Sequence, residues 1–276
     1  MAVSGTGTQN DPYIITTYDE LVEKAAESGK YLKIDNDINI IEEYPDGDMT
    51  QLVIKAVIDG NNKVISNWYY IGSDSLILIS NAGARVNNLT FRNIYTSILV
   101  DRKGFIQTTT SGGSDYIFNN CNFSGVVNSS FCWDTNRVNL FKQCSFNLKC
   151  TYDNKLFAGE NHNVPTGISC YIKVHCTKAC YINYYAWWID SYFEITADDA
   201  VKNSVMFRKD STCFDNCVID SYLTATETIT GDSAAISIVN STHAPNYSVA
   251  SNIALVDDTH WLDVSYLANT IGFNAG

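Results

Sequence analysis

A short phrase recurs along the middle of this chain: a polar residue, then a small residue, then an apolar residue two positions later. The copies close on six apolar residues, 32, 23, 26, 21 and 26 positions apart: Phe91, Phe123, Phe146, Ile172, Phe193 and Ile219. A repeat of roughly 20 to 30 residues with alternating apolar positions is typical of solenoids built from strand-bearing coils. One coil cannot bury its own inner face, so stacked coils must form the core. The repeat therefore predicts a single continuous solenoid.

Composition favours an all-β chain. Charged residues make up only 17% of the 276 residues, and only four prolines are present. Long helical periodicity is absent from the middle of the chain, where short apolar runs alternate with Asn, Asp and Gly clusters that are typical of turns. One solenoid of this length accounts for the chain as well as two ordinary domains would.

The two ends of the chain differ from the repeats. Thr17 is a hydroxyl N-cap followed by acidic residues, and Gly29 is placed to end the helix in a left-handed conformation. Such a helix would cover the open end of the core. A second short helix is expected over residues 257–269. The expected organisation is an N-terminal segment and capping helix over residues 1–30, the β-helix over 31–247 and a C-terminal cap over 248–276.

The net charge of −12 argues against some classes of partner. Phosphate binding requires clustered Lys and Arg, and no five-residue basic run occurs, so nucleic acid is not an expected partner. No stretch approaches 18 consecutive apolar residues, so no membrane insertion is expected. The first residues, 1–7, lack the basic and apolar regions of a signal peptide.

Nine cysteines are present, and the missing signal peptide predicts that they remain free thiols. The nearest approach to a zinc motif is Cys170, Cys176 and Cys180 with His175, but none of these gaps has the usual two-residue spacing. We therefore expect no metal and no cofactor. Four of the cysteines hold the same place in successive repeats, which predicts a ladder of small side chains inside the solenoid: Cys121, Cys144, Cys170 and Cys217.

Several of these segments resemble a known superfamily. The opening (residues 5–21), the internal Asn-Cys-x-Phe coils and the Ile58-Asp59-Gly60-Asn61 turn are similar to pectate-lyase-like right-handed parallel β-helix proteins. The ending, residues 266–273, resembles the tails of β-helix modules in gut-bacterial surface proteins and their phages. The resemblance implies an all-β, right-handed parallel β-helix, but its motifs do not specify an activity.

Enzymes of this superfamily use carboxylates that bind Ca²⁺ beside a basic residue, or a pair of carboxylates. The weak candidates here are Asp190 and Asp215, whose nearly equivalent repeat positions would set them one coil apart, about 4.8 Å. The favoured alternative is that both acids form turn hydrogen bonds. No Lys or Arg lies between Lys178 and Asp199 to complete a lyase site, so no catalytic residue is assigned.

The segment 181–193 carries seven aromatic residues, and alternation along a strand predicts that about half of them point outward. Four of them are candidates for glycan or subunit contact: Tyr184, Tyr185, Trp187 and Trp188. Packing between identical subunits is favoured, with a trimer as the preferred oligomer, over a stacking platform for sugars or simple surface display.

A β-helix chain without an export signal resembles a bacteriophage virion component that is made in the host cytoplasm and released by lysis. The expected function is a non-enzymatic virion structural protein, as a head decoration, head fibre or tail-associated fibre. Its partners would be other virion proteins and a glycan of the host surface. Two alternatives stay open, namely a tailspike-like polysaccharide lyase or hydrolase and a carbohydrate-binding surface module.

Overall fold

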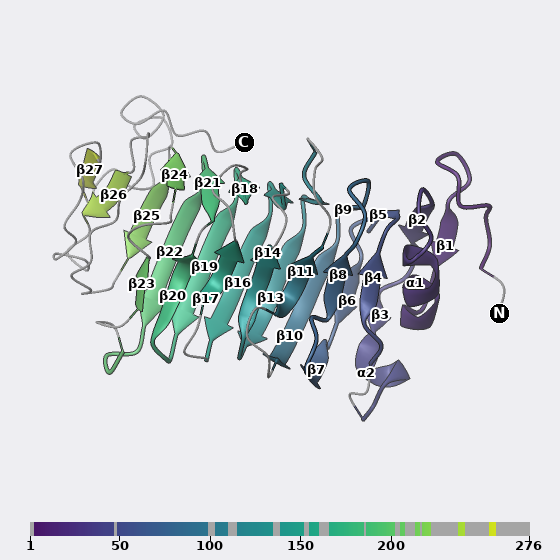
Figure 1. The fold of residues 1–276 in the computed structure, drawn as a ribbon, viewed down its shortest axis with the longest axis horizontal. Helices are drawn as coiled ribbons and strands as arrows, with labels where there is room; N and C mark the ends of the chain where they lie inside the picture. Colours follow the sequence, from purple (N-terminus) through teal and green to yellow (C-terminus); the bar gives the residue numbers. More distant parts are fainter. Residues whose placement is uncertain are drawn as a thin grey trace.

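The structure is a computed structural model that describes residues 3–46, 49–98, 103–109, 115–134, 139–151, 155–159, 166–184, 186–201, 205–207, 213–215, 217–221, 237–240 and 254–257. The strands form three sheets that run along the molecule, and over residues 31–207 each coil contributes in turn to all three (Figure 1). The strands of successive coils pair in parallel. The chain is therefore a parallel β-helix, as its repeat predicts.

Sheet A consists of nine short strands, in the order in which they pair: β1 (Tyr13–Ile15), β2 (Tyr31–Ile34), β5 (Val57–Asp59), β9 (Arg85–Asn87), β12 (Phe118–Asn119), β15 (Phe141–Lys142), β18 (Gly167–Ile168), β21 (Trp187–Ile189) and β24 (Cys213–Asp215). A single residue with φ between 46° and 54° follows five of these strands and turns the chain into sheet B: Asn88, Asn120, Gln143, Ser169 and Asp190. Asn and Asp tolerate this left-handed conformation better than most residues, which explains the polar residue that opens each repeat.

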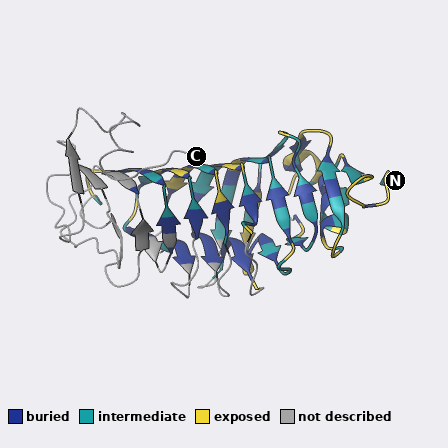
Figure 2. Ribbon diagram, turned by 90° about the horizontal axis from the view of Figure 1, so that it is seen from above, coloured by how far each residue is buried: buried dark blue, intermediate teal, exposed yellow. Residues whose placement is uncertain are grey.

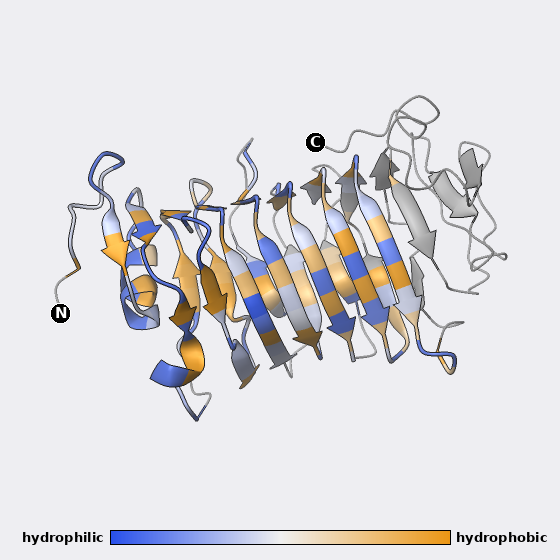
Figure 3. Ribbon diagram, turned by 180° about the vertical axis from the view of Figure 1, so that it is seen from behind, coloured by the Kyte–Doolittle hydropathy of each residue, from blue (hydrophilic) through white to orange (hydrophobic). Residues whose placement is uncertain are grey.

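Sheet B carries the longest strands: β3 (Ile38–Asn39), β6 (Val64–Ser66), β7 (Tyr69–Gly72), β10 (Thr90–Ile98), β13 (Asn122–Val127), β16 (Ser145–Cys150), β19 (Tyr171–Cys176), β22 (Tyr192–Ala197), β25 (Val218–Ser221), β26 (Ser237–Asn240) and β27 (Ala254–Asp257). Sheet C completes each coil: β4 (Leu52–Ile54), β8 (Ile77–Ile79), β11 (Gly104–Thr108), β14 (Ser130–Asp134), β17 (Lys155–Gly159), β20 (Cys180–Tyr184) and β23 (Val205–Phe207). Hydrophilic and hydrophobic residues alternate along the long strands (Figure 3).

The six apolar residues that close the repeats stack in register along sheet B, as predicted. Phe91 pairs with Phe123, and the same column continues through the later coils. The ring centroids of Phe91 and Phe123 are 4.8 Å apart, and those of Phe123 and Phe146 are 5.1 Å apart. Rings from sheets A and C complete a continuous buried core (Figure 2).

Helix α1 (Tyr18–Ala25) covers the N-terminal end of this core (Figure 1). Thr17 is its N-cap and forms a capping box with Glu20, as the sequence predicts. Tyr18 is buried, meets Trp68 edge to face at 5.7 Å, and donates a hydrogen bond to the Thr50 carbonyl oxygen at 2.8 Å. The buried face of α1 therefore covers the open end of the core, where a further coil would otherwise stack.

The helix ends earlier than its sequence suggests. Ala26 is the C-cap in a right-handed conformation, and Gly29 lies three residues further on with φ of 73°. Gly29 therefore shapes the turn into β2 and does not end α1. A second, four-residue helix, α2 (Ile40–Glu43), was not anticipated. Of the expected C-terminal cap, only residues 254–257 are described, and they form strand β27. Neither described helix is long and apolar enough to cross a membrane.

Candidate functional site

An open groove of about 650 Å³ lies over the outer face of sheet A. It begins at the N-terminal segment and crosses successive coils. Half of its lining residues carry side-chain amides, and the lining also includes one aromatic ring and two charged groups. The lining residues are Gln9, Pro12, Tyr31, Leu32, Lys33, Val57, Asp59, Asn87, Asn88, Asn119, Asn120 and Gln143. The groove therefore presents neutral hydrogen-bonding groups over several coils.

A second hollow of about 460 Å³ continues the first. The two share Asn87 and Asn119, and the second is otherwise lined by Arg85, Asp115, Tyr116 and Lys142. Burial raises the pKa of Tyr116 to about 12, so its hydroxyl is a neutral hydrogen-bond donor at physiological pH. Together the two hollows form one surface, which we call the amide groove.

The stacking of coils places the amides in two hydrogen-bonded rows. In the strands of sheet A, Asn119 Nδ2 donates to Asn87 Oδ1 at 3.1 Å. At the corner into sheet B, Asn120 Nδ2 donates to Asn88 Oδ1 at 2.9 Å, and Asn88 Nδ2 reaches Asp59 Oδ1 at 3.3 Å. Asn119 Nδ2 also donates to the Tyr116 carbonyl oxygen at 2.9 Å, so the hydrogen-bonding capacity that these rows leave lies mainly in the acceptor lone pairs of the amide oxygens.

The two carboxylates of the amide groove hold the structure together. Asp59 accepts hydrogen bonds from the backbone N–H of Asn61 at 3.0 Å and from Asn88. Asp115 forms an ion pair with Arg85 at 3.1 Å. With Lys33 and Lys142, the groove carries three positive and two negative side chains, although the whole chain is strongly acidic. Its local charge therefore does not repel neutral or weakly acidic ligands.

Three of the four aromatic candidates lie on described strands, in two different sheets. Tyr184 ends strand β20 of sheet C, whereas Trp187 and Trp188 belong to β21 of sheet A. Trp188 is fully buried, so the expectation that it supplies an outer contact is wrong. Its partner in the preceding coil is Gly167, where an added Cβ would lie 2.4 Å from the Trp188 ring. Tyr185 and the side chains of Tyr184 and Trp187 lie outside the described residues.

The candidate acids do not occupy equivalent positions. Asp215 pairs in register with Ile189, so Asp190 lies one residue further along the coil. Asp190 adopts φ of 46° and takes the corner position that asparagine holds in earlier coils. Asp190 therefore lies at a turn position, and the turn hydrogen bond expected of its side chain stays a prediction. The side chain of Asp215 lies outside the described residues.

Stacking also creates a charged cluster on sheet B that sequence spacing did not reveal. Lys173 and Glu194 are in register on adjacent strands, with Nζ and Oε1 2.7 Å apart. Partial burial opposes ionisation of Glu194, but hydrogen bonds from Lys173 and Tyr171 lower its pKa. Glu194 is therefore held as an anion, and its Cα is paired with that of Asp220 in the next coil. A register prediction would have been needed to find this pairing.

The cysteine ladder is confirmed, and a second thiol group appears. Eight cysteines are free and buried, and the side chain of Cys213 is outside the described residues. Cys121 and Cys144 donate to backbone carbonyl oxygens at 3.4 Å, and burial raises the pKa of both thiols. A different group forms the described set that is able to hold a metal ion: Cys150, Cys176 and Cys180.

No family model matches the sequence, and no curated protein matches it. Among solved structures, the chain is similar to one described as "a putative immunoglobulin A1 protease from Bacteroides ovatus". The TM-score is 0.52 and the sequence identity is 14%, and the match covers 96% of this chain and 89% of that chain. At this identity the likeness shows a shared β-helix fold and carries no information on activity.

Proposed function

We propose that this protein is a non-enzymatic attachment protein that binds a glycan chain along the amide groove. The observation that carries the proposal is the alignment of amide side chains over successive coils of sheet A, shared between two adjoining hollows. A groove open along its length accepts an internal segment of a polymer, whereas an enclosed pocket selects a small molecule or a chain end.

The chemistry of the groove suits a sugar. Hydroxyl groups both donate and accept hydrogen bonds, and amides offer both functions without charge. Tyr31 adds an aromatic ring to the groove wall, and Tyr116 adds a neutral hydroxyl at the other end. Ligand sites commonly combine apolar or aromatic surface with a few polar groups that fix orientation.

The roles of the groove acids favour binding over catalysis. Glycoside hydrolysis generally needs an acid with a raised pKa opposite a second carboxylate. Asp59 and Asp115 instead hold an amide row and an arginine in place. The second candidate, a polysaccharide lyase or hydrolase, is favoured only by the cluster of Lys173 and Glu194 with Asp220 in register.

The proposed setting is the bacteriophage virion, as a head decoration or a head or tail fibre. This placement rests on the resemblance of residues 266–273 to the tails of β-helix modules in gut-bacterial surface proteins and their phages. Proteomic analysis of purified particles tests it: recovery of this chain at structural stoichiometry supports a virion role, whereas its recovery only from bacterial envelopes supports a surface module.

Glycan binding is tested on the purified full chain with an array of bacterial polysaccharides, followed by calorimetry on the strongest binder. Asn87→Ala and Asn119→Ala should weaken binding at least about tenfold, because each removes an amide shared by both hollows. Asn147→Ala, on the outer face of sheet B, is the matched control and should bind normally. Equal affinity of all three variants, or binding to no polysaccharide, would refute the proposal. Shortening of the bound chain would favour the enzyme.

A further inference from the structure

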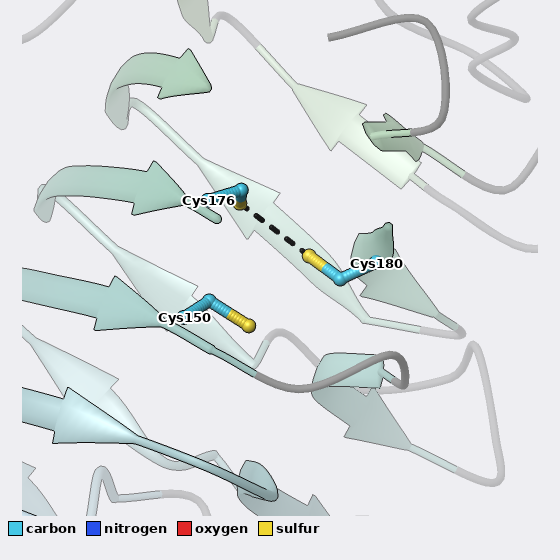
Figure 4. Close-up of side chains that lie close together, drawn as sticks. All are labelled: Cys150, Cys176 and Cys180. Atoms are coloured by element: carbon cyan, nitrogen blue, oxygen red, sulfur yellow. Dashed lines mark hydrogen bonds between the residues drawn. The ribbon is translucent and has the colours of Figure 1, made fainter. Parts of the chain in front are cut away.

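Three cysteines meet at the corner between sheets B and C (Figure 4). Cys150 ends strand β16 and Cys176 ends strand β19, and the two are in register. Cys180 begins strand β20 after a three-residue corner. All three side chains are buried, with exposed fractions of 2%, 0% and 3%. The solenoid therefore brings together thiols from two coils and two sheets.

The spacing of the sulfur atoms fits a shared metal ion. All three Sγ atoms lie within 4.8 Å of one another, and those of Cys176 and Cys180 are 3.5 Å apart. Thiolates bind zinc at about 2.3 Å, so two sulfurs on one such ion lie at most about 4.6 Å apart. Movements of a few tenths of an ångström would bring the three sulfurs into a coordination sphere.

These thiols differ from those of the cysteine ladder. Cys121 and Cys144 lie at the opposite end of the sheet B strands, one in each coil, and their thiols contact each other and donate to backbone carbonyl oxygens. The thiols of Cys176 and Cys180 hydrogen-bond to each other. A packing role explains the ladder but does not require three converging sulfurs.

We propose that Cys150, Cys176 and Cys180 form a binding site for a soft monovalent metal ion of the Cu(I) class. Thiolate ligands select soft ions, whereas structural zinc sites nearly always have four ligands. Within the described part of the chain, no histidine, aspartate or glutamate supplies a fourth ligand atom. Three sulfurs in a dry corner suit an ion that accepts two or three ligands.

The binding step balances with the release of protons. One Cu(I) ion displaces the protons of two thiols and forms three Cu–S bonds, two to thiolates and one to the third, neutral thiol, which leaves a complex of charge −1. Loss of the third proton would give charge −2, which burial disfavours. The corner of residues 177–179 separates the group from solvent and includes the exposed Lys178, so the path for an entering ion is short.

The test uses the reduced full chain under anaerobic conditions and Cu(I) buffered by a chromophoric chelator. We expect one Cu(I) per chain in competition with the chelator, and X-ray absorption that shows only sulfur neighbours. Cys176→Ser and Cys180→Ser should bind at least about tenfold more weakly, whereas Cys144→Ser should bind as the wild type does. Circular dichroism checks that each variant is folded.

Three outcomes would overturn the site: no Cu(I) retained by the wild type, unchanged affinity in folded Cys176→Ser, or nitrogen and oxygen neighbours in the absorption spectrum. If the serine variants do not fold, the wild type still decides the question. A stoichiometry other than one Cu(I) per chain, or nitrogen and oxygen neighbours in the absorption spectrum of the wild type, would then refute the proposal.

Discussion

Truncation of Phe146 should strongly destabilise the middle of the solenoid. Its side chain is 1% exposed, and its ring centroid lies 5.0 to 5.6 Å from those of four other phenylalanines: Phe123, Phe131, Phe141 and Phe157. Phe-to-Ala changes in cores cost about 3–5 kcal/mol. We expect the upper part of this range for Phe146→Ala, because the aromatic pairs contribute stability beyond the burial of the ring. In addition, the paired strands on both sides prevent the structure from closing the cavity that the missing ring leaves.

Urea denaturation followed by tryptophan fluorescence measures this cost, since the Trp188 ring lies 6.3 Å from that of Phe146. Asn147→Ala is the matched control: the next residue on the same strand is exposed, and its loss should change stability by less than about 0.5 kcal/mol. Phe146→Leu should fall between the two. A loss below about 1 kcal/mol for Phe146→Ala, or a loss equal to that of Asn147→Ala, would refute the stacked core as the main source of stability.

The same experiment reports on cooperativity between coils. Each coil of a solenoid contacts only its neighbours, so a defect in a central coil weakens the coupling between the two halves. Phe146→Ala should therefore also lower the dependence of the unfolding free energy on urea, because the halves begin to unfold separately. An unchanged slope would mean that the chain still unfolds as one unit.

Two further predictions concern the outer surface. The pKa of Glu194 is lowered in the folded state, so its ion pair stabilises the fold above the unfolded pKa of about 4.3. The stability difference between wild type and Glu194→Gln should shrink as the pH falls from 6 to 3, and a constant difference would contradict this. Sedimentation at micromolar concentration should show an oligomer, with a trimer favoured, that Trp187→Ala weakens, whereas a monomer unaffected by the change would exclude association through these aromatics.

The sequence was most informative where one coil position repeats. The column of Phe91, Phe123 and Phe146 and the ladder of Cys121 and Cys144 follow from spacing alone, because equivalent positions of stacked coils must meet. The N-cap at Thr17 was equally clear, since capping depends on neighbours within one turn.

Features that depend on register between coils escaped prediction. Alternation suggests that some aromatics turn inward but does not identify them. Trp188 is buried because Gly167, in the preceding coil, leaves room for its ring. Lys173 meets Glu194 from 21 residues away, and Cys150 reaches Cys176 in the same manner. A shift of one residue would separate each of these pairs, so only the structure reveals them.

Parallel stacking also makes this chain a stiff spacer that uses many residues for each increment of length. Neighbouring strands lie about 4.8 Å apart, so each coil of 21 to 32 residues extends the molecule by only that distance. The same residues in extended form would span roughly 70 Å or more. The residues that do not add length form lateral surface instead. They also resist bending, because each coil is hydrogen-bonded to the preceding coil along three sheets. Adding a whole coil would therefore move an element at the end of the solenoid outward by one strand spacing. Its orientation would change only by the twist of that one coil.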